Sequence, residues 1–374
     1  GVAERDENTG VPEGRRHSRR AARQSAKSAP SVLASGQHGA LSLEAPGATA
    51  QGCGRQAVNL VTGATGFIGQ RLIRELETDG ATCRRLSRQP ISCTDSFVAD
   101  LADKSALTAP CRGVDRIFHC AGHAHAFSSL TGDEAATHWR VNFEGTRNLV
   151  EAAGQSGVRR FVFLSSVKAM AEPDEFCADE DFPGQPETAY GRAKRAAEEV
   201  ILELGNRYAM HVVNLRLAMV YGAGGRGNLE RMGRLVRRGL FPPLPETGNH
   251  RSLIHVSDVV AAMRRVANDA RANGRTYIIA AHEAPSGREI FDALRAALGM
   301  RPCAWAVPRF LLHFAATGGD LLETLTRRRM PLDHEVLDRL LESAWYSPAR
   351  IDRELGWRAS ITLADGLAEM LASR

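Results

Sequence analysis

Residues Val58–Leu76 read VNLVTGATGFIGQRLIREL, which places an apolar run, a glycine-rich turn and a helix-length segment in immediate succession. The apolar run Val58–Thr62 predicts a buried strand, and the segment Phe67–Thr78 has the spacing of a helix. Glycines at such a turn let the backbone approach a pyrophosphate, which meets the free N–H groups of the helix N-terminus. The stretch therefore predicts a dinucleotide-binding turn.

The glycines of this turn have the spacing G-x-x-G-x-x-G, with Ala64 where the commoner dinucleotide fingerprint has its first glycine. The strand before the turn and the helix after it favour the dinucleotide interpretation over an ordinary loop. We expect the cofactor to contact the residues of the turn, which are Gly63, Thr65, Gly66, Phe67, Ile68 and Gly69.

Short apolar runs alternate with helix-length segments after this turn. Strands separated by helices form right-handed crossovers and a parallel sheet. We therefore predict an α/β fold, a Rossmann-like doubly wound parallel sheet with a smaller, interleaved C-terminal α/β substrate-binding region. Further strands are predicted at Thr82–Leu86, Arg116–Cys120, Phe161–Leu164 and His211–Leu215, and helices at, for example, 144–156 and 191–205.

The chain divides into three regions. Residues 1–56 contain almost no large apolar side chains, which predicts a disordered extension. The lack of acidic residues in Arg15–Leu43 is also typical of an organellar presequence, which is the alternative. We expect residues 57–217 to form the NAD(P)-binding domain and 218–374 mainly the substrate-binding region. Two later strands, near Ser252–Val256 and Thr276–Ala280, are expected to join the Rossmann sheet.

Charge and cysteine content exclude several classes of protein. The net charge is +5, and residues 1–57 hold eight Lys/Arg against five Asp/Glu, so nucleic-acid binding is not expected of the nearly neutral remainder. The seven scattered cysteines contain no C-x-x-C pair and predict no disulfide framework. No apolar run reaches the roughly 18 residues of a membrane span. We expect a soluble cytoplasmic protein without a membrane span.

The end of the second predicted strand bears on the choice of cofactor. An NAD-preferring site usually carries Asp or Glu there for the ribose 2′-hydroxyl, whereas this chain has Ser87 and Arg88. These two side chains suit a 2′-phosphate and favour NADP(H). NAD(H) is the alternative if Arg88 is merely solvated. Four residues at other strand ends are expected beside the adenine or under the cofactor: Asp100, Leu101, Ala121 and Gly122.

A catalytic group is predicted from two further segments. Ser165 and Ser166 end the Phe161–Leu164 strand, and Tyr190 and Lys194 open a helix. Positions i and i+4 share a helix face, so the phenol and the amine point the same way. The charge of Lys194 favours the phenolate, and Ser166 is placed to hydrogen-bond the reacting oxygen.

Several of these motifs, in this order, resemble the extended short-chain dehydrogenase/reductase superfamily and, within it, the nucleotide-sugar epimerases and 4-ketoreductases. The resemblance runs from about Val58 to Leu371. Besides the segments above, it rests on Val141–Thr146, Val220–Gly222, Arg251–Asp258 and Glu354–Trp357.

The resemblance implies roles for individual residues. Ser166, Tyr190 and Lys194 would be catalytic, and Asn142 would shape the active-site helix and the cofactor site. Asn228 and Arg251 resemble residues that hold the diphosphate of a UDP- or dTDP-sugar. A homodimer through the helices 142–156 and 190–205 is also implied. We further expect Ser165, Lys168, His123 and His125 to line the sugar pocket.

The resemblance also limits which reactions of this superfamily can be expected. Related dehydratases carry acidic residues just after the catalytic hydroxyl, where this chain has Val167 and Lys168. The expected activity is therefore hydride transfer from NADPH to C4 of a UDP-4-keto-6-deoxy-N-acetylhexosamine while Tyr190 donates a proton to O4. The alternatives are an NAD-dependent UDP-hexose 4-epimerase and, more remotely, a non-catalytic NAD(P)-binding regulator. His119, His123 and His125 cluster without a carboxylate, so no metal site is predicted.

Overall fold

The computed structural model describes residues 56–123, 132–173, 175–225, 227–314, 317 and 341–372. These residues fall within one unit that spans Arg55–Arg374. The predicted extension lies outside the described residues except for Gln56, so its disorder stays a prediction. Within the described ranges, no helix is both long and apolar enough to cross a membrane.

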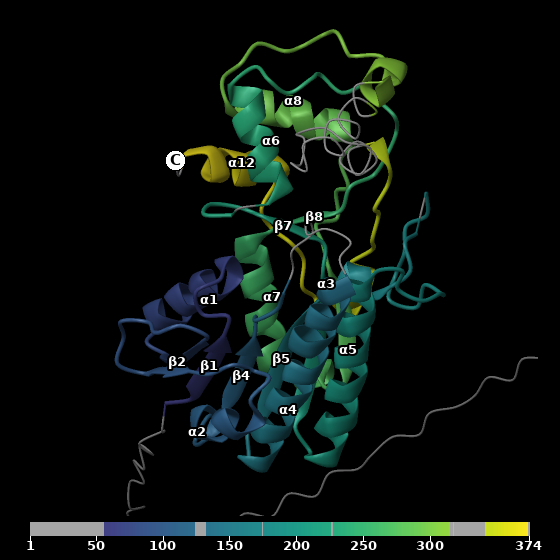
Figure 1. The fold of residues 1–374 in the computed structure, drawn as a ribbon. Coiled ribbons are helices and arrows are strands. Elements are labelled where there is room, and N and C mark those ends of the chain that lie inside the picture. Colours follow the sequence, from purple (N-terminus) through teal and green to yellow (C-terminus); the bar gives the residue numbers. More distant parts are fainter. Residues whose placement is uncertain are drawn as a thin grey trace, which may run out of the picture. The chain divides into compact units, whose positions relative to one another are not determined.

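The core is a parallel sheet with the strand order β3-β2-β1-β4-β5-β6-β9 (Figure 1). This order reverses direction between β1 and β4, which is the switch point of a doubly wound fold. The predicted Rossmann-like fold class is confirmed. The strands are β1 (Val58–Thr62), β2 (Thr82–Ser87), β3 (Ser96–Val98), β4 (Arg116–His119), β5 (Arg160–Ser166), β6 (His211–Leu217) and β9 (Arg275–Ile279).

Helices cover both faces of the sheet because successive strand side chains are apolar on both sides. In β5, Val162 packs into the core cluster that contains α1 (Phe67–Thr78) and α7 (Val256–Asn268). Its neighbours Phe161 and Phe163 pack into the opposite cluster, with α4 (Gly145–Gln155) and α5 (Ala189–Arg207). The helices α2 (Thr108–Cys111) and α3 (Gly132–His138) complete the N-terminal half.

The C-terminal residues build a smaller layer with its own apolar cluster, in which α6 (Asn228–Arg237), α8 (Gly287–Ala297) and α12 (Leu363–Ala372) pack together (Figure 1). The helix α11 (Ala349–Leu355) packs near β9 instead. A two-stranded parallel sheet, β7 (Met219–Tyr221) with β8 (Leu253–His255), connects to this layer.

One strand predicted for the Rossmann sheet is placed elsewhere. The strand near Thr276–Ala280 joins the sheet as β9, but the strand near Ser252–Val256 is β8 and pairs with β7. Both edges of β6 are occupied, by β5 and β9, so β8 has no place beside it. The prediction for this segment was wrong because sequence pattern does not assign pairing partners.

Candidate active site

A cleft of about 230 Å³ opens at the carboxyl ends of β1, β2 and β4. Ligands of doubly wound sheets bind at this edge, because the N-termini of the following helices point toward it. Most residues that the sequence assigned to the cofactor line this cleft: Gly63, Thr65, Gly66, Ser87, Arg88, Asp100, Leu101, Ala121 and Gly122.

The glycine-rich turn is so tight that two of its glycines have no room for a side chain. Gly63 has φ +63°, and a Cβ there would lie 2.8 Å from the backbone nitrogen of Ala121. A Cβ on Gly69 would lie 2.3 Å from the carbonyl oxygen of Gly63. The turn therefore brings bare backbone to the cleft, which fits a pyrophosphate.

The first residues of α1 were expected to contact the cofactor, and the structure does not place them in the cleft. Phe67 and Ile68 are its first residues and are not among those lining the cleft, and Ile68 packs on the core. The preceding residue, Gly66, has no side chain to cap the helix. The N–H groups of the first turn therefore have no side-chain acceptor from the cap position, which leaves them available to an anion.

The arginines near the end of β2 differ in their surroundings. Arg88 is exposed and lines the cleft. The other two are held by carboxylates of adjacent segments, Arg84 by Asp95 and Arg85 by Glu77. Of these three arginines, Arg88 is thus the one that lines the cleft.

Helix α5 brings its inward row of side chains against the end of β5. Tyr190, Lys194 and Glu198 are four residues apart and lie on one helix face. The Lys194 amine donates a hydrogen bond to the Leu164 carbonyl oxygen at 2.9 Å, and the Tyr190 hydroxyl hydrogen-bonds with the Ser166 side chain. The structure therefore brings together the three residues expected to be catalytic.

This group borders the cofactor cleft at Gly122. A Cβ on Gly122 would lie 3.3 Å from the Lys194 Nζ and 3.1 Å from the Asn142 Oδ1. Lys194 is buried, with its Nζ 4.6 Å from the centroid of the Phe163 ring. The amine is therefore close to the cleft floor, where it can reach a nicotinamide ribose.

Burial changes the acidity of both groups. Burial raises the pKa of Tyr190 to about 12, and the hydrogen bond from Ser166 opposes this shift only in part. Burial lowers the pKa of Lys194 to about 8, against the attraction of Glu198 and Cys120. The phenol pKa thus moves opposite to the direction expected from the sequence, because burial outweighs the favourable contacts. At neutral pH the pair is a neutral phenol beside an ammonium group, which suits proton donation.

Ser165 does not face the expected sugar pocket. Its hydroxyl is buried and donates a hydrogen bond to the Glu198 Oε1 at 2.5 Å. Successive residues of a strand point to opposite faces, so only one of two adjacent serines can face the cleft. The prediction that Ser165 binds substrate is corrected on this ground.

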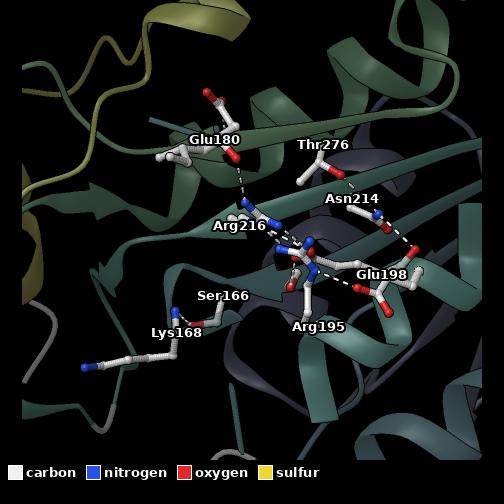
Figure 2. Close-up of polar contacts among 11 residues, drawn as sticks. Ser166, Lys168, Glu180, Arg195, Glu198, Asn214, Arg216 and Thr276 are labelled. Atoms are coloured by element: carbon white, nitrogen blue, oxygen red, sulfur yellow. Dashed lines mark hydrogen bonds and ion pairs between the residues drawn. The ribbon is translucent and has the colours of Figure 1, made fainter. Parts of the chain in front are cut away.

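Lys168 is also engaged elsewhere. Its amine is ion-paired with Glu172, while its backbone N–H donates to the Ser166 hydroxyl at 3.2 Å. Figure 2 shows the Lys168 side chain running away from Ser166. The structure therefore does not support the sugar contact expected of Lys168.

Asn142 holds the segment beside the cleft in place. Its Oδ1 accepts from the His123 backbone N–H at 2.8 Å, and its Nδ2 donates to the His123 carbonyl at 2.9 Å. The buried His138, one turn earlier, has its ring centroid 5.0 Å from that of His123 and 5.6 Å from that of Tyr190. Sequence reasoning missed His138, although its i, i+4 spacing from Asn142 was a usable signal. His125 lies outside the described residues.

His119 organises the cleft floor and does not resemble a metal ligand. Thr62 hydrogen-bonds its Nδ1 at 2.7 Å, and Thr146 hydrogen-bonds its Nε2 at 2.9 Å. Thr62 also accepts from the Ala121 N–H, and Thr146 donates to the Asn142 carbonyl. Burial lowers the His119 pKa to about 3, so the ring is neutral. Among the residues that the structure describes, no group of His, Cys, Asp and Glu could hold a metal ion.

The two residues expected to bind the diphosphate lie away from the cofactor cleft. Asn228 is exposed at the start of α6. The Arg251 guanidinium donates to the Glu342 carbonyl at 3.2 Å. Its neighbours Asn249 and His250 line a polar cavity of about 580 Å³, which also includes Glu172. Arg251 itself does not line this cavity.

Comparisons with known proteins agree with this geometry. A sequence model described as the NAD dependent epimerase/dehydratase family matches residues 59–280. A UDP-glucose 4-epimerase from Vibrio cholerae is 27% identical, covering 83% of this chain and 93% of that relative. A 3-beta-hydroxysteroid dehydrogenase from Mycolicibacterium neoaurum is 26% identical, covering 83% and 90%.

A solved structure shows the same arrangement of elements. The protein MoeE5, in complex with UDP-glucose and NAD, superposes with a TM-score of 0.67 at 26% identity. The match covers 85% of this chain and 98% of that one.

Proposed function

The chain belongs to the NAD-dependent epimerase/dehydratase family, and from this premise we propose that it transfers hydride between NADP(H) and C4 of a UDP-sugar. The proposed reaction is reduction of a UDP-4-keto-6-deoxy-N-acetylhexosamine. The observation that carries the proposal is the convergence of Ser166, Tyr190 and Lys194 beside a glycine-lined cleft. The relatives named UDP-glucose 4-epimerase and MoeE5 support the UDP-sugar class.

The proposed roles follow from the protonation states. Reduced nicotinamide supplies the hydride when bound. Ser166 hydrogen-bonds the C4 oxygen, and Tyr190, protonated at neutral pH, donates its proton to that oxygen. Lys194, one turn away on the same helix face, would hold the nicotinamide ribose, and its positive charge would favour the phenolate that forms. Asn228 and Arg251 are proposed to bind the substrate diphosphate, and the homodimer and cytoplasmic location stay predictions.

A 4-epimerase is the second candidate, because a relative with that printed name covers most of the chain. An epimerase must keep its hydride between two half-reactions, and therefore retains its cofactor. A reductase exchanges cofactor in every cycle. Retention of cofactor on purification thus separates the two.

The test is to denature the purified full chain, identify released nicotinamide cofactor by mass spectrometry, and titrate the empty protein with NADPH and NADH. We expect no retained cofactor, tighter binding of NADPH, and turnover of a UDP-4-keto-6-deoxy-N-acetylhexosamine. Stoichiometric NAD together with interconversion of UDP-hexoses would establish the epimerase instead. Turnover of a 3β-hydroxysteroid but of no UDP-sugar would overturn the substrate class. Cofactor binding without turnover of any of them would favour the regulator.

Substituting Arg88 with Glu tests the proposed 2′-phosphate contact. We expect the NADPH dissociation constant to rise by about 10- to 100-fold, because a charge-assisted hydrogen bond contributes about 1.5–3 kcal/mol. NADH binding should change little. Fluorescence titration measures both dissociation constants. Arg85→Gln, in the preceding strand β2, is the control, since Arg85 is paired with Glu77. Equal losses for NADH and NADPH would contradict the assignment.

A further inference from the structure

Behind the catalytic group lies a buried ion pair that joins α5 to the sheet. The Arg216 Nη2 is 2.7 Å from the Glu198 Oε2, and the two side chains are only 5% and 3% exposed. The Arg216 Nε also donates to the Glu198 Oε1 at 3.0 Å. Figure 2 shows the guanidinium of β6 facing the carboxylate of α5.

This pair is tied to the end of β5. Arg216 and Ser165 are register partners on the adjacent strands β6 and β5, so they share one face of the sheet. Ser165 donates to the same carboxylate oxygen of Glu198 at 2.5 Å. The pair is therefore linked by one hydrogen bond to the residue directly before Ser166.

Three consecutive turns of α5 thus contact three consecutive residues of β5. Tyr190 contacts Ser166, Lys194 contacts the Leu164 carbonyl, and Glu198 contacts Ser165. Of these contacts, only the one at Glu198 is reinforced by a buried charge from a third element. Arg216 also donates to the Glu180 carbonyl at 3.3 Å, which extends the anchorage beyond the sheet.

We propose that Glu198 and Arg216 are positioning residues that set the register of α5 against β5, and that Glu198 keeps the Lys194 amine charged and in place. This inference rests on the proposed function for its effect on turnover. Other charged or titratable groups that face Lys194 are Cys120 and His119 of the neighbouring β4 segment, and His119 is neutral.

The first test replaces Glu198 with Gln in the full chain. Misplacement of a catalytic group by about 1 Å can cost about 10²-fold. We therefore expect kcat/KM to fall by about 10- to 100-fold. The alkaline limb of the pH profile, near pH 8 in the parent where Lys194 loses its charge, should move to lower pH because Glu198 raises the Lys194 pKa.

A matched control is available on the same helix. Glu199 forms an ion pair with Arg195 across one helix turn, and its side chain is 65% exposed. Glu199→Gln removes the same charge one residue away and should leave kcat/KM and the pH midpoint unchanged. Ser165→Ala, which removes only a hydrogen bond to Glu198, should lower kcat while the pH midpoint stays.

A double variant separates positioning from stability. Glu198→Gln leaves the Arg216 charge buried without its partner, which destabilises the fold. Combining it with Arg216→Met removes that charge and should raise Tm toward the parent value, while kcat/KM stays low because α5 has still lost its anchor to β5 and β6. If the double variant recovered kcat/KM as well as Tm, the proposal would be overturned, and the ion pair would have only a structural role.

NADPH binding can be measured without any sugar substrate, so it tests this inference independently of the proposed reaction. Because Lys194 is proposed to hold the ribose, NADPH binding to the parent should weaken as pH rises through about 8. The pH at which this weakening is half complete should be lower in Glu198→Gln than in the parent, and should be unchanged in Glu199→Gln. If the parent turns over no UDP-sugar but these midpoints differ as stated, the reaction is wrong and the positioning stands. An unchanged midpoint in Glu198→Gln overturns the positioning itself.

Discussion

Replacing Tyr190 with Phe should lower kcat by about 10²- to 10⁴-fold, the range that loss of a positioned proton donor costs. The substitution removes one hydroxyl, whose pKa of about 12 keeps it protonated at neutral pH. The NADPH dissociation constant should change little, because the substitution keeps the aromatic ring and removes only a hydroxyl that hydrogen-bonds with Ser166. Steady-state kinetics and fluorescence titration on the same preparation measure the two quantities.

The matched control for this variant is Tyr208→Phe. Tyr208 caps the C-terminal end of the same helix and packs near Gly154, far along α5 from Ser166. It should retain full kcat. If Tyr190→Phe also retained kcat, the proton would come from another group, and the buried His138 beside the ring would be the first to examine.

Gly69→Ala is expected to abolish tight cofactor binding and to lower the free energy of unfolding by about 1–3 kcal/mol. The added Cβ would lie 2.3 Å from the Gly63 carbonyl oxygen and 3.0 Å from its carbonyl carbon. Both are backbone atoms, so the glycine-rich turn itself must move, and the turn forms the cradle for the pyrophosphate. Denaturant unfolding and NADPH titration measure the two effects.

Gly80→Ala is the comparison for Gly69→Ala. Gly80 has φ +76°, and a Cβ there would meet nothing within 4 Å, so its substitution adds backbone strain without a collision. We expect it to cost about 1–2 kcal/mol of unfolding free energy and to leave NADPH binding intact. Unchanged NADPH binding in Gly69→Ala would contradict the proposed cradle.

Local pattern predicted the cofactor half of the molecule closely. The strand β1 and the helix α1 begin and end at the predicted residues, 58–62 and 67–78. The predicted turn residues and strand-end residues largely meet at one cleft. This follows because the edge formed by the carboxyl ends of parallel strands is fixed once the strands are parallel. The catalytic roles came from the resemblance, and the structure adds that Ser166, Tyr190 and Lys194 converge.

Local sequence pattern therefore suffices for the element types, the doubly wound class and the residues of the glycine-rich turn, since each depends on neighbours within a few positions. Only the tertiary structure shows that Ser166 contacts Tyr190 while Ser165 contacts Glu198, that Lys168 pairs with Glu172, and that β8 pairs with β7. It also decided the ion pair between Glu198 and Arg216, 18 residues apart in sequence. These contacts depend on strand register and on the packing of a helix against a sheet, which periodicity does not encode.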